Sequence, residues 1–202
     1  MDQPMPNLAF QMMSAMFKLR DLLRPRGPIL AEAGIEPGDR VLDFGCGPGA
    51  YVPAAAERVG ATGVVYALDL HPLAIQKVED LAGRKRLTNV RTIHSDCNTG
   101  LPDDSVDVVL LYDILHMLSD PHAVLGELHR VLKPDGVLSL NEPHMGEEDV
   151  VSRMSDSRLF TMARRGEHTY SFAPVSHPRH IEQPAPSADG VSLLGHLERS
   201  GA

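Results

Sequence analysis

Short apolar runs alternate with amphipathic segments along the middle of this chain. The apolar runs are rich in Val, Leu and Ile, and they occupy residues 40–44, 63–69, 90–94, 106–111 and 136–141. Segments with helical spacing of apolar positions separate them at residues 50–59, 72–82 and 121–132. Strands that are apolar throughout are typical of parallel strands covered on both faces. The alternation therefore predicts an open, doubly wound α/β sheet. A turn at Lys133–Gly136 is expected to precede the last of the five strands.

The pattern changes on either side of this region. Residues 8–23 carry apolar side chains at i, i+3, i+4 and i+7 spacing, which predicts an amphipathic helix. That helix would pack on the domain, act as a lid over a site or lie on a membrane surface. After the last run, residues 147–157 are expected to be helical, and residues 158–165 and 168–173 to form a hairpin. The remaining residues, rich in Pro, Ser, Gly and His, predict a flexible tail. We divide the chain into an N-terminal helix, a core domain and a tail, at residues 1–27, 28–173 and 174–202.

Bulk composition narrows the functional classes. A length of 202 residues fits one domain, and a formal net charge of −8 disfavours a nucleic acid as partner, because such binding depends on Lys and Arg at phosphates. The two cysteines, Cys46 and Cys97, form neither a disulfide framework nor a zinc motif and fit a reducing compartment. The sequence contains no secretory signal pattern and no apolar run of the roughly 20 residues that span a bilayer. We therefore expect a soluble cytoplasmic protein with a small-molecule partner and no stable membrane insertion, and leave its oligomeric state open.

The strongest local signal is the segment Val41–Ala50, which follows a predicted strand and opens a predicted helix. Its glycines, Gly45, Gly47 and Gly49, let the backbone turn tightly and approach a ligand without a Cβ in the way. The helix N-terminus behind them offers N–H groups that suit a carboxylate. Gly45, Gly47 and Ala50 also satisfy the dinucleotide fingerprint G-x-G-x-x-G/A, so an NAD(P)-dependent oxidoreductase stays an alternative, as does a purely structural turn.

Acidic residues stand at the ends of the next two predicted strands. Asp69 follows Gly49 by twenty residues and can accept hydrogen bonds from the two ribose hydroxyls of either class of nucleotide. Asp96 ends the third strand, where a carboxylate can accept from an adenine amino group. The fourth strand ends in Tyr112 and Asp113.

Taken in order, these segments resemble the class I S-adenosylmethionine-dependent methyltransferases, especially the broad group related to the ubiquinone/menaquinone C-methyltransferases. The resemblance covers residues 36–143 and rests on DFGCGPG, ALDL, HSDC, LPDDSVDVVLLYDILHML and RVLKPDGVLSLNEP. It implies a Rossmann-like, seven-stranded, mostly parallel sheet in which the last hairpin supplies one antiparallel strand. It also implies an enzyme that moves the methyl group of S-adenosylmethionine. The acceptor is not identified, because the resemblance does not extend to the segments that cap the substrate.

The resemblance also implies roles for individual residues. The implied cofactor-binding set is Asp43, Gly45, Gly47 and Gly49 at the methionine moiety, Asp69 at the ribose, Leu70 on the adenine, Asp96 and Cys97 at the adenine amino group, and Tyr112 near the sulfonium.

A general base matters only if the acceptor loses a proton near the transition state. The catalytic candidates at the strand ends are Tyr112, His116 and His144, with Asp113 and Glu142 beside them in the sequence. Both histidines are equally well explained as surface or loop residues. The two histidines could form a metal-ligand set with Glu142, since some oxygen-methylating enzymes use a divalent cation, but we assign no metal, because the histidines lack the i, i+4 spacing of a helical ligand pair. The expected function is methyl transfer to a small molecule. An RNA or protein methyltransferase, an NAD(P)-dependent oxidoreductase and a non-catalytic S-adenosylmethionine-binding subunit remain alternatives.

Overall fold

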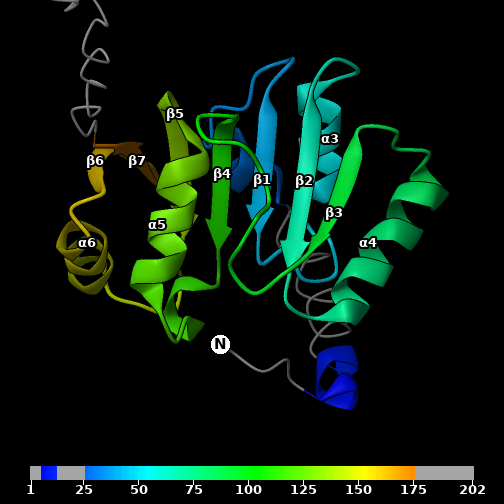
Figure 1. Cartoon of the computed structure of the whole chain (residues 1–202), viewed down its shortest axis with the longest axis horizontal. Helices are drawn as coiled ribbons and strands as arrows, with labels where there is room; N and C mark the ends of the chain where they lie inside the picture. The colour runs from blue at the N-terminus through cyan, green and yellow to red at the C-terminus, as the bar shows by residue number, and fades with distance from the viewer. Residues whose placement is uncertain (1–5, 13–25, 176–202) are drawn as a thin grey trace, which may run out of the picture.

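The computed structural model describes residues 6–12 and 26–175 (Figure 1). The helix expected over residues 8–23 is therefore described only in part. Residues 7–12 are helical, and the rest of that helix lies outside the described residues. The tail expected after residue 173 also lies outside them, apart from Pro174 and Val175. The division of the chain into three segments thus stays a prediction.

Seven strands form a single sheet in the order β3-β2-β1-β4-β5-β7-β6 (Figure 1). The strands are β1 (Arg40–Phe44), β2 (Val64–Asp69), β3 (Val90–His94), β4 (Val106–Tyr112), β5 (Leu132–Asn141), β6 (Phe160–Arg165) and β7 (Tyr170–Pro174). Strands β1 to β5 pair in parallel, whereas β7 runs antiparallel to both of its neighbours, β5 and β6. The predicted doubly wound, seven-stranded sheet with one antiparallel strand is confirmed.

Helices cover both faces of this sheet, with α5 in front of it and α3 behind it in Figure 1. The helices are α2 (Gly27–Ala31), α3 (Val52–Val59), α4 (Pro72–Lys85), η1 (Leu115–Met117), α5 (Pro121–Val131) and α6 (Glu147–Asp156). Successive side chains of a strand point to opposite faces. Accordingly, Leu42 of β1 and Leu111 of β4 pack with α5 and α6, while Val41 and Leu110 pack with α2 and α3. The central strands are therefore buried on both sides, as their unbroken apolar runs require.

The largest difference from the expected boundaries is at the start of β5. The turn predicted at Lys133–Gly136 does not precede the strand, because β5 already begins at Leu132. Leu132 is buried and pairs with Val106 of β4, and the pairing then jumps to Val137 opposite Val108. The turn residues form a bulge inside the strand, since the apolar Leu132 joins the sheet before them.

Two smaller differences lie near the glycine segment. The short helix α2 was not expected, because it contains a proline, Pro28. This proline lies in the first turn of the helix, where its missing N–H group breaks no helical hydrogen bond. Helix α3 begins at Val52 rather than at residue 50, so the loop that follows β1 is longer than predicted.

The order of the strands determines where a ligand can bind. Strands β1 and β4 are neighbours in the sheet, although β2 and β3 come between them in the sequence. The connection after β1 therefore leads to one side of the sheet and the connection after β4 to the other. Doubly wound sheets bind ligands in the crevice between two such strands, beyond their carboxyl ends. In the described part of the chain, no helix combines the length and the apolar character needed to cross a bilayer.

Candidate functional site

A cavity of about 450 Å³ opens at the carboxyl ends of β1, β2 and β4. Its size is within the usual range of small-molecule sites, roughly 300–1,000 Å³. It collects most of the residues that the sequence predicts for the site. Those lining it are Asp43, Gly45, Gly47, Asp69, Leu70, Asp96, Tyr112, His116 and His144.

The loop after β1 forms the floor of the cavity through its backbone. The N–H groups of Gly45 and Cys46 both donate to the carbonyl oxygen of Leu68, at 2.9 Å each. Gly45 (φ +75°) and Gly47 (φ +53°) have positive φ angles, which side chains rarely allow. A Cβ at Gly45 would lie 2.9 Å from the side chain of Ile114, whereas one at Gly47 would meet no protein atom within 4 Å. Because Gly47 lines the cavity, its missing side chain leaves that space open to a ligand.

Asp43 is a buried carboxylate at the end of β1. Among the residues that the structure describes, its Oδ2 atom has no hydrogen-bond partner. Burial, together with repulsion from Asp69, raises the pKa of Asp43 to about 7, against the opposing charge of Arg26. A carboxylate in this position favours a cationic group in the cavity, which would supply the missing partner.

Asp69 lies at the end of β2 and holds two loops together. Its Oδ2 accepts a hydrogen bond from the N–H of Gly47 at 2.8 Å, and its Oδ1 accepts one from the N–H of His71 at 2.7 Å. Burial raises the pKa of Asp69, although both backbone hydrogen bonds act in the opposite direction. Each carboxylate oxygen has a second lone pair with which it can accept a further hydrogen bond.

Tyr112 belongs to an aromatic wall of the cavity. Its ring contacts that of Tyr51 edge to face, with 4.8 Å between centroids, and the guanidinium of Arg26 donates to the Tyr51 hydroxyl at 2.6 Å. The Tyr112 hydroxyl lies 2.9 Å from Ser139 Oγ. Burial raises the pKa of Tyr112 well above its ordinary value, so the hydroxyl stays protonated and is a poor general base.

The described N-terminal residues close one end of the cavity. Phe10 is only 2% exposed, and its ring stacks on that of His71 with 4.2 Å between centroids. The ammonium group of Lys77, on the helix α4 that follows His71, lies 5.0 Å from the centre of the Phe10 ring. Of the alternatives that the sequence leaves for the N-terminal helix, this packing supports a segment that covers the site.

We expect Phe10→Ala to weaken the binding of a cavity ligand about tenfold and to lower the free energy of unfolding by about 3–5 kcal/mol, because truncation removes a buried ring. The matched control is Leu8→Ala, since Leu8 is 69% exposed on the same short helix. Calorimetric titration and chemical denaturation of both variants measure the effect. Equal behaviour of the two would contradict the covering role of residues 7–12.

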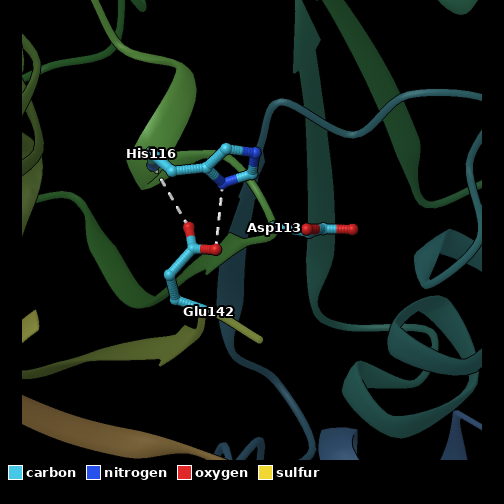
Figure 2. A group of neighbouring side chains, drawn as sticks. All are labelled: Asp113, His116 and Glu142. Carbon is cyan, nitrogen blue, oxygen red and sulfur yellow. Dashed lines mark hydrogen bonds and ion pairs between the residues drawn. The ribbon is translucent and has the colours of Figure 1, made fainter. Parts of the chain in front are cut away.

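Four polar side chains lie together at the other end of the cavity, and Figure 2 draws three of them, Asp113, His116 and Glu142. His116 Nδ1 lies 2.9 Å from Glu142 Oε1, and the backbone N–H of His116 donates to Glu142 Oε2 at 3.2 Å. His144 Nε2 lies 3.1 Å from Asp113 Oδ1, and the two imidazole rings are 4.9 Å apart. The predicted catalytic histidines are thus neighbours, and Glu142 and Asp113 hold them.

Two predicted residues lie elsewhere. Gly49 does not line the cavity; a Cβ there would lie 3.0 Å from Val78 of α4, so the glycine allows the helix to pack closely. Cys97 also lies outside the lining and is partly buried against the core on the α5 side. Neither position supports the ligand contact expected of it.

Several lining residues were missed by the sequence analysis. They are Phe10, Arg26, Phe44, Cys46, Pro48, Ala50, Tyr51, Leu68, His71, Ser95, Ile114, Met117 and Leu118. Most of them are sequence neighbours of a motif residue, so they could have been predicted as lining residues from the sequence. Phe10 and Arg26 precede the first strand and adjoin no motif, so only the folded chain brings them to the site.

The sequence profile of the family described as "Methyltransferase domain" matches residues 35–181 of this chain. The chain belongs to this family. The predicted relationship to class I methyltransferases of the quinone C-methyltransferase group is thereby confirmed.

Individual members of the family show how far the similarity extends. A demethylmenaquinone methyltransferase from Geobacillus sp. (strain WCH70) is 32% identical over 128 residues, which are 63% of this chain and 55% of the relative. A trans-aconitate 2-methyltransferase from Rhizobium rhizogenes is 30% identical over 176 residues, or 87% of this chain and 64% of the relative. The crystal structure of a SAM-dependent methyltransferase from Aquifex aeolicus superposes with a TM-score of 0.66 at 28% identity, covering 77% of this chain and 96% of the other. The chain thus spans between about half and two thirds of the length of these two sequence relatives.

Proposed function

We propose that this protein transfers the methyl group of S-adenosylmethionine to a small-molecule acceptor. The observation that carries the proposal is the buried Asp43 carboxylate, whose Oδ2 lacks a partner beside a glycine loop in a chain of the methyltransferase-domain family. S-adenosylmethionine carries an ammonium and a sulfonium group, and either would compensate a buried negative charge.

The charges around the cavity favour this cofactor over a dinucleotide. Among the described residues, four carboxyl groups line the cavity, at Asp43, Asp69, Asp96 and Asp113, and one guanidinium does so, at Arg26. A carboxylate-rich, partly desolvated cleft repels the pyrophosphate of NAD(P) and attracts a sulfonium cation. This supports methyl transfer and disfavours the alternative of an oxidoreductase.

Individual roles follow from position. We assign the methionine moiety to the loop of Gly45 and Gly47 with Asp43, and the ribose hydroxyls to the free lone pairs of Asp69. The adenine would lie between Leu70 and Asp96, and Phe10 would cover this end. The sulfonium would lie near Tyr112, which we retain as part of the wall rather than as a base.

The acceptor would enter at the end of the cavity that holds His116 and His144. Because a sulfonium is already a good leaving group, an in-line displacement needs chiefly proximity and alignment. The exposed Met117 and the partly buried Leu118 line this end and offer an apolar surface to the acceptor. The relatives named for demethylmenaquinone and trans-aconitate support a small acceptor rather than a nucleic acid, as does the net charge of −8.

The test is a calorimetric titration of the purified protein with S-adenosylmethionine, S-adenosylhomocysteine and NADH. We expect micromolar binding of the first two and none of the third. An acceptor screen that monitors release of S-adenosylhomocysteine would follow. Binding of NADH alone would overturn the proposal, and cofactor binding without turnover on any acceptor class would favour a non-catalytic subunit.

We expect Asp69→Ala to weaken the binding of S-adenosylmethionine by about 1.5–3 kcal/mol, the usual contribution of a charge-assisted hydrogen bond. The substitution also removes the acceptor of the Gly47 N–H group, so the loop loses support. The control is Asp80→Ala, an exposed aspartate of α4. Calorimetry of both variants measures the effect, and unchanged affinity in a folded Asp69→Ala variant would refute the ribose assignment.

A further inference from the structure

We propose that Asp113, His116, Glu142 and His144 form a binding site for one divalent transition-metal ion at the acceptor end of the cavity. The inference does not need the proposed function, because it concerns ion binding alone. Only the part that such an ion would play in methyl transfer rests on that function.

The distances between the donor atoms fit a metal site. One donor atom each from Asp113, His116 and Glu142 can be chosen so that all lie within 4.8 Å of one another. Ligands about 2.0–2.2 Å from a metal lie about 3 Å apart at right angles and about 4.2 Å apart across the ion. The pair His116 Nδ1 and Glu142 Oε1, at 2.9 Å, and the pair His144 Nε2 and Asp113 Oδ1, at 3.1 Å, already have the shorter separation. The donors of Asp113, His116 and Glu142 therefore need only a small contraction to bind an ion, and His144 would join them from its place beside Asp113.

Charge also favours a cation in this place. The side chain of Glu142 is wholly buried, and that of Asp113 is only 18% exposed. Within the described residues, the ion pairs of Glu142 come from His116 and from no lysine or arginine. Two carboxylates thus lie close together in a partly buried pocket. A dication bound between them would compensate both negative charges at once.

The backbone holds the four side chains in place and leaves a way in. Asp113 has a positive φ angle of 60°, and its N–H donates to the carbonyl oxygen of Asn141 at 2.7 Å, which ties the end of β4 to the end of β5. The N–H groups of His116 and His144 both donate to the Glu142 carboxylate. The His116 and His144 side chains are 30% and 58% exposed, so an ion can reach them from solvent or from the cavity. Figure 2 shows the Glu142 carboxylate facing the His116 ring with Asp113 beside the pair.

The donor types narrow the choice of ion. Two imidazoles and two carboxylates suit Zn²⁺, Co²⁺, Mn²⁺ or Fe²⁺ better than Mg²⁺ or Ca²⁺, which prefer all-oxygen sites. The helical-spacing argument against a metal does not apply here, because the four residues come from three segments: the end of β4, η1 and the turn after β5.

The test is a titration of chelator-treated protein with ZnCl₂ and CoCl₂ by calorimetry, with MgCl₂ as comparison. We expect one equivalent of Zn²⁺ or Co²⁺ to bind with micromolar or tighter affinity, and bound Co²⁺ to acquire visible absorption bands. Asp113→Asn and His144→Ala should each weaken binding at least tenfold. The sequence holds ten histidines, so a histidine outside the site serves as the matched control. His122 is exposed on α5, and His122→Ala should bind the metal ion as the wild type does.

The outcomes separate cleanly. The absence of Zn²⁺ and Co²⁺ binding, or wild-type metal affinity in both site variants, would overturn the inference. A greater loss of metal affinity in His122→Ala than in His144→Ala would also overturn it. His144 is the most exposed of the four, so its variant should fold, and a titration with S-adenosylhomocysteine verifies that the cavity is intact. Wild-type protein that binds S-adenosylhomocysteine but no metal refutes the metal site alone, whereas the reverse result refutes the proposed function alone.

Discussion

Gly47→Val should bind S-adenosylmethionine at least about 100-fold more weakly than the wild type, a loss of about 2.8 kcal/mol. A Cβ at this position meets no protein atom within 4 Å, so the substitution creates no clash inside the protein. The new side chain instead projects into the cavity that Gly47 lines, where we place the methionine moiety. The positive φ of +53° adds a strain of about 1–2 kcal/mol, which lowers stability but is separable from binding.

The matched control separates these two effects. Gly34 also has a positive φ, of +74°, and an added Cβ there meets nothing within 4 Å, but Gly34 is exposed and does not line the cavity. We expect Gly34→Val to lower the melting temperature about as much as Gly47→Val does, while retaining wild-type affinity. Calorimetry with thermal denaturation of both variants decides the matter. A folded Gly47→Val protein with normal affinity would show that the ligand does not occupy this part of the cavity.

Asp43→Asn should stabilise the ligand-free protein at pH 8 while weakening the binding of S-adenosylmethionine at least about tenfold. Burial raises the pKa of Asp43 from 3.8 to about 7 in the folded state. The folded protein therefore holds a proton that the unfolded chain has released. The resulting stabilisation is fully present below about pH 4 and is lost as the pH rises through about 7. At about 1.36 kcal/mol per pKa unit, the change is at most about 4 kcal/mol.

An amide cannot ionise, so the variant should lack this loss of stability between pH 5 and pH 8. We expect a gain of about 1–3 kcal/mol over the wild type at pH 8, because a new buried N–H donor offsets part of the benefit. Chemical denaturation at both pH values measures it. The control is Asp80→Asn, the same chemical change at an exposed position of α4. If Asp43→Asn is no more stable than the wild type at pH 8, the buried carboxylate is not destabilising there.

The expected gain in stability of Asp43→Asn has a general physical cause. A site that binds a cationic cofactor keeps a negative charge away from water before the cofactor arrives, and this lowers the stability of the empty protein. Residues selected for binding are therefore among those whose replacement can stabilise the fold.

Much of the fold followed from the sequence alone. The central strands are nearly continuous apolar runs, and segments of helical spacing follow most of the runs, so local periodicity was enough to predict the doubly wound sheet. The glycine loop after β1 and the acidic residue after β2 could be found because their chemistry depends on neighbours in the sequence. Boundaries were less accurate where a tertiary partner decided them. The bulge at Lys133–Gly136 exists because Leu132 pairs with Val106.

The acceptor end of the cavity could not be predicted in the same way. His116 and Glu142 are 26 residues apart, and they meet because β4 lies beside β5 and both strands end at the same edge of the sheet. Likewise, Phe10 and His71 are far apart in the sequence, and their rings stack only in the folded protein. Local periodicity and motifs determined the family, the sheet and the cofactor loop, because these depend on short-range patterns of size and polarity. The convergence of the histidines and carboxylates, and the covering of the cavity by Phe10, depend on which strands and loops become neighbours in space, and only the tertiary structure decides that.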